Sequence, residues 1–263
     1  MSNAMDEMFE IERRDSILIL RMNRPDRRNA ISQDVWLGLP DLVERINAMD
    51  DLRLVVLTSS TPGMFSSGAD LVEFKEVGFD VEWSISNQRA VGAALQALAE
   101  CVHPTLAAID GPTIGAGAAL AIVCDFRIAT PGSIFAIPPA KLGIVYPQFA
   151  TVALVALVGE RHARSLLLTA RTIAADEAAQ MGLIDRIVPD LESGVTAVAA
   201  DFSSTSPTAV RLLKQSIRRA VNDPTALSDD LVRAAVTSAD FREGVHAFIE
   251  RRPPGFASIS GQD

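Results

Sequence analysis

Short apolar runs alternate with helix-like segments along much of the 263-residue chain. The runs at residues 17–20, 54–57 and 105–109 are bounded by polar or turn residues, which is typical of buried strands. Residues 126–129 are also extended in character. The segment 32–48 has helical spacing, with apolar side chains on one side at Val35, Leu39, Leu42, Val43 and Ile46. Strands that alternate with helices predict a layered α/β architecture.

The rest of the pattern is dominated by small residues and then by helices. A loop at 63–68 precedes helical spacing from Leu71, and residues 116–123 predict a tightly packed helix of small side chains. From about residue 201 the pattern is helical only, with candidate helices at 207–220, 225–238 and 242–250. We therefore expect a core over residues 5–200 and a C-terminal all-helical subdomain over residues 201–263.

Charge and composition narrow the possible functions. The chain has 24 lysines and arginines against 33 aspartates and glutamates, a net charge of −9, which argues against a nucleic-acid or anionic-membrane binder. Two cysteines and three scattered histidines predict neither a disulfide framework nor a metal site. Ser2, Asn3 and Ala4 resemble an expression-tag remnant, and no secretory signal is visible. We expect a soluble cytoplasmic protein without a metal.

Two glycine-bearing segments are the best candidates for chemistry. FSSGADL at 65–71 and DGPTIGAGAAL at 110–120 each place small residues between a strand and the start of a helix. Backbone N–H groups at such a position can hold an oxyanion, although glycine-rich turns before helices are also common without any function. The GAGAAL part is not a dinucleotide fingerprint, because Leu120 occupies the position of the third glycine.

The order of several motifs resembles the crotonase (enoyl-CoA hydratase/isomerase) family. The motifs are NRPDRRNA at 23–30, MFSSGADL at 64–71, AAIDGP at 107–112, IGAGAAL at 114–120, CDFRIA at 124–129, AAQMGLID at 178–185 and EGVHAFIERR at 243–252. The resemblance implies a spiral of ββα units followed by a helical subdomain that packs trimers, often paired into hexamers. It also implies a coenzyme A thioester as substrate and no cofactor beyond its coenzyme A moiety.

Carried onto this sequence, the resemblance assigns the site residues. The backbone N–H groups of Ala69 and Ala116 would hold the thioester carbonyl. Arg27 and Arg28 would pair with the phosphates, unless they form only a solvated basic loop. Phe248 would cover the adenine, often from a neighbouring subunit, unless it only packs in its helix. The other residues expected to contact coenzyme A are Ala30, Ser67, Gly68, Asp70, Leu71 and Arg251.

The departures from the family pattern matter most for the reaction. The two glutamates that activate water in hydratases fall at Ala119 and Pro139, which should line an apolar substrate pocket instead. Neither side chain exchanges a proton, so standard hydration should be lost. The extra aspartate of dienoyl-CoA isomerases falls at Pro147.

Tyr146 is the one candidate substitute to which we give a role. The segment 135–146 looks like the segment that carries the active-site tyrosine of methylmalonyl-CoA decarboxylases in this family. Tyr146 could orient a carboxylate or protonate a carbanion, or it could be a packed tyrosine bonded to a backbone carbonyl. Glu73 and Glu82 are conceivable pocket residues without an assigned role. The functional alternatives are an enzyme that isomerises, decarboxylates or cleaves a CoA thioester and a silent acyl-CoA-binding or structural protein.

Overall fold

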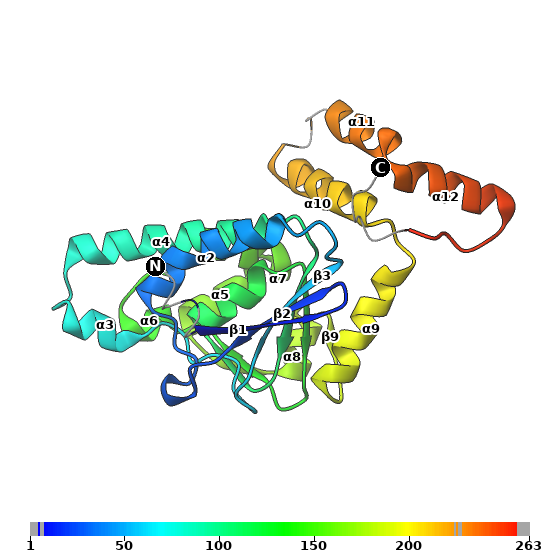
Figure 1. Ribbon diagram of the computed structural model, residues 1–263. Helices are drawn as coiled ribbons and strands as arrows, with labels where there is room; N and C mark the ends of the chain where they lie inside the picture. Colours follow the sequence, from blue (N-terminus) through cyan, green and yellow to red (C-terminus); the bar gives the residue numbers. More distant parts are fainter. Residues whose placement is uncertain (1–4, 6–7, 224, 226–227, 257–263) are drawn as a thin grey trace.

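The computed structural model describes residue 5 and residues 8–223, 225 and 228–256. The suspected tag remnant and residues 257–263, the end of the expected C-terminal subdomain, lie outside that range. Figure 1 shows a layered core of sheet and helices, with three C-terminal helices standing to one side of it.

The main sheet has six strands in the order β1-β2-β3-β4-β6-β9. Its first pair is antiparallel and the other neighbours are parallel. The strands are β1 (Phe9–Arg14), β2 (Ile17–Met22), β3 (Leu54–Ser59), β4 (Thr105–Ile109), β6 (Phe126–Ala129) and β9 (Arg186–Ile187). The four strands expected from the apolar runs are therefore confirmed. A second sheet joins β5 (Pro112–Ile114), β7 (Ile134–Ala136) and β8 (Thr172–Ala174).

The helices cover these sheets and continue into the C-terminal unit. Those of the N-terminal half are η1 (Pro25–Arg27), α2 (Gln33–Asn47), α3 (Leu71–Glu76), α4 (Val81–Ala99) and α5 (Ala116–Val123). They are followed by α6 (Pro139–Leu142), α7 (Gln148–Thr169), α8 (Ala175–Gln180) and α9 (Leu191–Ser203), and then by α10 (Pro207–Asn222), α11 (Asp229–Thr237) and α12 (Ala239–Glu250). The small side chains of α5 let it pack against both α4 and α7, and residues 117–123 are all buried.

The expected boundary at residue 201 falls inside α9. This helix packs against β4 and β6, and its Val198 is buried with Leu106 and Ile128 of those strands. The start of the all-helical region therefore covers one face of the main sheet. The helices that stand apart begin with α10.

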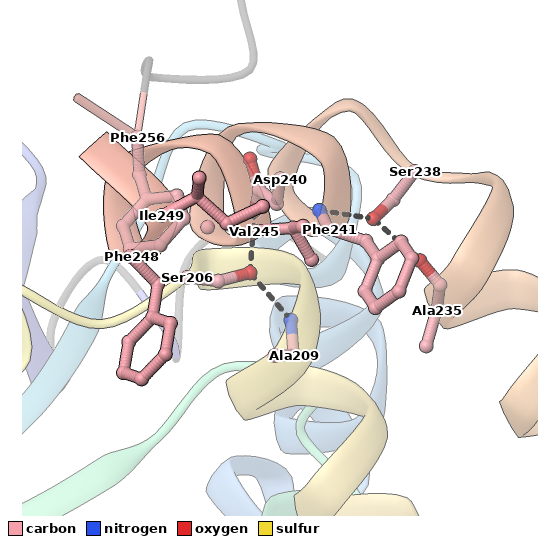
Figure 2. A pocket seen from close by; sticks show the side chains of 11 residues that line it. Ser206, Ala209, Ala235, Ser238, Asp240, Phe241, Val245, Phe248, Ile249 and Phe256 are labelled. Carbon is pink, nitrogen blue, oxygen red and sulfur yellow. Dashed lines mark hydrogen bonds between the residues drawn. The ribbon is translucent and has the colours of Figure 1, made fainter. Parts of the chain in front are cut away.

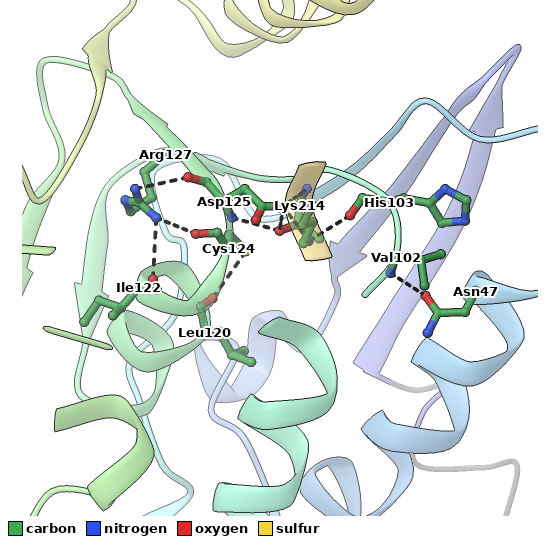
Figure 3. Close-up of polar contacts among 10 residues, drawn as sticks. Asn47, Val102, His103, Leu120, Ile122, Cys124, Asp125, Arg127 and Lys214 are labelled. Carbon is green, nitrogen blue, oxygen red and sulfur yellow. Dashed lines mark hydrogen bonds and ion pairs between the residues drawn. The ribbon is translucent and has the colours of Figure 1, made fainter. Parts of the chain in front are cut away.

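Several polar contacts attach the C-terminal unit to the core, among them those of Lys214 and Arg53. Figure 3 shows Lys214 of α10 reaching Asp125, with Nζ 2.5 Å from Oδ2, and donating to His103 O at 2.9 Å. The Arg53 guanidinium donates to three carbonyls, those of Phe202, Thr205 and Phe256, at 3.0 to 3.1 Å. The last two carbonyls lie just before α10 and just after α12, so Arg53 binds the chain on both sides of the unit.

No helix in the part of the chain that the structure describes has the length and apolar character needed to cross a membrane. The same residues contain no group of three or more His, Cys, Asp or Glu side chains placed to hold a metal ion. Both cysteines are buried, and burial raises the pKa of the Cys124 thiol to about 12.

Candidate active site

Two glycine-rich loops meet where β5 leads into α5. Ser66 and Thr113 form a parallel bridge, and Ile114 N donates to Ser66 O at 3.0 Å. Gly68 has a φ of +103°, and a Cβ there would lie 3.0 Å from Ile114 O. A side chain at this position would therefore be strained and crowded, so the close approach of the two loops depends on glycine.

Two backbone donors face a common cavity at this junction. The N–H groups of Ala69 and Ala116 donate to no acceptor within the described residues, and both residues line the same cavity of about 220 Å³. Ala116 is the first residue of α5, where the helix dipole favours negative charge. Unpaired N–H groups on one small cavity are suited to a carbonyl oxygen that becomes an enolate, and one such donor contributes about 3 kcal/mol to a transition state.

The rest of the cavity wall is mainly apolar. It is contributed by the start of α2, by α3 and α4, and by the segment that includes α6 and ends at Pro147. Its larger apolar members are Ile31, Trp36, Leu71, Phe74, Val91, Leu142, Ile144 and Val145. Such a wall favours the hydrocarbon part of an acyl group.

Tyr146 lines the cavity and is hydrogen-bonded to the residue that directly precedes α5. Its hydroxyl donates to Gly115 O at 3.0 Å, next to the Ala116 donor. Burial raises the pKa of the Tyr146 phenol above its usual range, so the group stays protonated at neutral pH. The hydroxyl proton is therefore donated to the backbone, as expected for a packed tyrosine, and Tyr146 is also the phenol among the residues that line the cavity.

Glu73 is the carboxylate among the cavity-lining residues. It lies in α3 and accepts the Gln33 N–H at the start of α2, with the shorter distance 2.9 Å. Burial raises the pKa of the Glu73 carboxyl, and the negative charge of Asp70 adds to this effect. Glu73 is thus the one of the two conceivable pocket carboxylates that lines the cavity. Glu82 is exposed and does not line the cavity.

The two positions that lack glutamate are placed differently. Pro139 begins α6 and lines the cavity, as does Pro147. Ala119, expected on the pocket wall, is instead fully buried in the core and is not a lining residue.

The residues expected to contact coenzyme A fall into three groups. Ser67, Gly68 and Leu71 line the cavity, and Ala30 is buried beside them. Asp70 is not a lining residue, because its carboxylate pairs with Arg24 at 3.3 Å and accepts the Val72 N–H at the start of α3.

Arg27 and Arg28 form the exposed second group, held next to the cavity loop. Ser67 N donates to Arg28 O at 2.9 Å, while neither guanidinium forms an ion pair with another described residue. Both charges are therefore available to an anion beside the cavity.

Phe248 and Arg251 form the third group and do not line the cavity of their own chain. Phe248 is 86% exposed on α12, and Arg251 is the residue that ends this helix. Figure 2 shows Phe248 at a separate pocket of about 440 Å³ between α10, α11 and α12. In this chain the two residues are thus separated from Ala69 and Ala116.

The fold and the paired backbone donors define a protein of the crotonase class. A family model described as enoyl-CoA hydratase/isomerase matches residues 12–259. The chain is 31% identical over 262 residues to a crotonyl-CoA hydratase from Syntrophomonas wolfei, covering 96% of this chain and 98% of that protein. The chain belongs to the enoyl-CoA hydratase/isomerase family, whose enzymes act on CoA thioesters.

Solved structures agree with this assignment and confirm the expected fold class. An enoyl-CoA hydratase/isomerase family protein from Hyphomonas neptunium matches with a TM-score of 0.91 at 32% identity, covering 97% of this chain and 100% of the other. An enoyl-CoA hydratase from Bacillus anthracis matches with a TM-score of 0.86 at 27% identity, covering 95% and 98%. The architecture of ββα units followed by C-terminal helices is therefore that of the family.

Proposed function

We propose that this protein converts a CoA thioester through an enolate held by the Ala69 and Ala116 N–H groups, and that it does not hydrate by the two-glutamate route. The observation that carries the proposal is the pair of unpartnered donors on one cavity whose wall has Pro139 in place of a carboxylate. The donors stabilise negative charge, while the usual pair that activates water is missing.

Loss of carbon dioxide from a 2-carboxyacyl-CoA is the reaction that these residues support best. The C–C bond to the carboxylate breaks, and its electron pair becomes the enolate on the thioester. This step needs no base. The Tyr146 phenol, kept protonated by burial, would orient the carboxylate before this step, or after it would give one proton to the α-carbon and regain a proton from water.

Isomerisation of an enoyl-CoA is the second candidate, and Glu73 is the observation that favours it. Moving a double bond requires a group that removes a proton and returns it, and the raised pKa of Glu73 brings this carboxyl closer to neutral pH. A silent acyl-CoA binder is the third candidate. It is supported by the hydrogen bonds that Glu73 and Tyr146 already make to the backbone.

The test is incubation of the purified protein with methylmalonyl-CoA, a 3-enoyl-CoA and crotonyl-CoA, followed by mass spectrometry. Loss of carbon dioxide that is abolished in Tyr146→Phe supports decarboxylation, and double-bond movement abolished in Glu73→Gln supports isomerisation. Rapid hydration of crotonyl-CoA would contradict the proposal. Tight binding of all three thioesters without any product would support the third candidate, a silent acyl-CoA binder.

We further propose that coenzyme A lies along the cavity loop. Ser67, Gly68 and Leu71 would contact its pantetheine end together with Ala30, and the free charges of Arg27 and Arg28 would hold its phosphates. Asp70 would act indirectly by fixing the start of α3. Phe248 and Arg251 would reach the adenine of a neighbouring subunit, since they lie away from the cavity of their own chain.

The neighbour would be a second copy in a trimer, alone or paired into a hexamer. Exposed apolar side chains support this assembly: Leu213, Ile217 and Val221 recur every four residues on α10, and Phe248 and Ile249 lie on α12. A monomer would leave these side chains in water.

A further inference from the structure

Helix α4 contributes two amide side chains to the cavity wall, and one of them, Asn87, is buried. Asn87 lies near the middle of this helix, is 7% exposed and lines the cavity with Val91 one turn later. Asparagine is a weak helix former, and the polar group is removed from bulk water. Neither helix stability nor core packing explains an amide at this position.

The Asn87 amide is unpartnered. Its Oδ1 is fully buried without a hydrogen-bond partner, while its Nδ2 is not among the fully buried unpaired atoms and donates to no acceptor in the described part of the chain. Turning the amide by 180° exchanges the two atoms and leaves a buried polar atom unpaired in either orientation. A buried amide without partners is unfavourable, so this one is suited to a group that arrives with a ligand.

Three other polar side chains of the cavity wall make hydrogen bonds to the protein. Glu73 accepts the Gln33 N–H, and the Tyr146 hydroxyl donates to Gly115 O. Gln88, the neighbour of Asn87, donates to Val145 O at 3.4 Å. Asn87 therefore differs from these cavity residues in having its hydrogen-bonding capacity free.

We propose that Asn87 selects the acyl group by hydrogen bonding to a hydroxyl that the acyl chain carries. The inference rests on the proposed function, because it places the acyl chain of a CoA thioester in this cavity. A hydroxyl both donates and accepts, and so pairs with Oδ1 or Nδ2 of the amide. A plain hydrocarbon chain leaves the amide unpaired, and a carboxylate has no proton to give to Oδ1.

The experiment compares hexanoyl-CoA with its 4-, 5- and 6-hydroxy derivatives by titration calorimetry. These thioesters are saturated and lack a second carboxylate, so neither proposed reaction consumes them. The variants are Asn87→Leu, which keeps the shape of the side chain, and Gln96→Leu. Gln96 provides the matched control, because it is an exposed amide on the same helix and does not line the cavity.

The wild-type protein should bind at least one hydroxylated thioester about tenfold more tightly than hexanoyl-CoA. Asn87→Leu should lose this preference and bind hexanoyl-CoA at least as tightly as the wild type, while Gln96→Leu should keep the preference. The melting temperature of Asn87→Leu should rise, because an unpaired buried amide is removed. Asn87→Ala provides a second variant if the leucine does not fit.

Equal dissociation constants for all four thioesters in the wild type would overturn the role of Asn87 and leave the proposed function intact. A hydroxyl preference that persists in Asn87→Leu and Asn87→Ala would overturn it as well. Absence of binding for every thioester would overturn both the proposed function and the inference that rests on it.

Discussion

Gly117 in the first turn of α5 lies directly against Ser66 of the neighbouring loop. A Cβ at Gly117 would be 2.5 Å from Ser66 Cβ and 2.8 Å from its Oγ. The Ser66 hydroxyl is itself fixed, because it donates to Asn29 O at 2.7 Å. The two loops that carry Ala69 and Ala116 can therefore approach this closely only because residue 117 has no side chain.

Gly117→Ala should lower the free energy of unfolding by about 1–3 kcal/mol, the usual effect of overpacking a closed contact. It should also weaken acyl-CoA binding, since the two donors are pushed apart. Urea denaturation and calorimetry measure these effects. Gly92→Ala is the control, because Gly92 lies in helix α4 with open space around it and alanine favours helices. Equal stability of the Gly117→Ala protein and the wild type would contradict the crowding argument.

Lys214→Met should destabilise the attachment of the C-terminal unit. The Lys214 side chain is 10% exposed, and its loss leaves Asp125 and the His103 carbonyl without their cation. The partner carboxylate is partly exposed, so we expect a decrease of about 1–3 kcal/mol in the free energy of unfolding, less than for a fully buried pair. Chemical denaturation provides the value, and Lys75→Met on exposed α3 should change it little.

His103 should make the protein less stable in mild acid. Burial lowers the pKa of His103, and the positive charge of Arg211 lowers it further. The unfolded chain therefore binds a proton more readily, and stability falls with pH from about 6.5 down to the lower folded-state pKa. The slope contributed by His103 is at most about 1.4 kcal/mol per pH unit.

The measurement is the free energy of unfolding at pH 7.5 and pH 5.5 for the wild type, His103→Gln and His246→Gln. The glutamine at 103 can still donate to Ile46 O, as the His103 Nε2–H does at 3.2 Å. His103→Gln should show a smaller acid loss than the wild type, while His246→Gln, changed at an exposed position of α12, should match the wild type. Identical pH dependence in all three proteins would refute the assignment.

The double variant Arg27→Gln/Arg28→Gln should bind coenzyme A thioesters about tenfold more weakly than the wild type. Removing two unpaired cations beside the cavity loop should also reduce the salt dependence of binding, because fewer charge pairs are screened. Arg161→Gln, at an exposed position of α7, is the matched control. Unchanged affinity at low and high salt would show that Arg27 and Arg28 form only a solvated basic loop and do not bind the phosphates.

Ile217→Glu should dissociate the proposed trimer. Ile217 is 65% exposed on α10 between Leu213 and Val221, so a charge there would be desolvated in an interface and harmless in a monomer. Light scattering coupled to gel filtration gives the mass. A wild-type protein that is already monomeric would contradict the assembly, and Gln215→Glu on the same helix controls for added charge.

The apolar periodicity predicted the elements whose side chains are mostly buried. Strands β2, β3, β4 and β6 and the buried face of α2 follow from it, because their side chains report burial directly. The edge strand β1 was missed, since most of its residues are accessible to water. Helix α11 begins at Asp229 and not at residue 225.

Little of the site could be read without the family resemblance. The roles proposed for Ala69 and Ala116 use backbone atoms, which leave no chemical signature in a sequence. Glu73 and Asn87 lie on α3 and α4, and only the packing of these helices over the loops brings them to the cavity. An alanine at position 119 could be seen to lack a carboxylate, but not to lie beneath the cavity wall.

Arg53 connects both ends of the C-terminal unit to the core. The Arg53 guanidinium donates to the carbonyls of both Thr205 and Phe256. These hydrogen bonds close the segment between the two residues into a non-covalent ring. Swinging the three helices outward would break both contacts, together with those of Lys214. A second copy of the chain that packs against these helices would therefore find them already oriented by contacts to their own core.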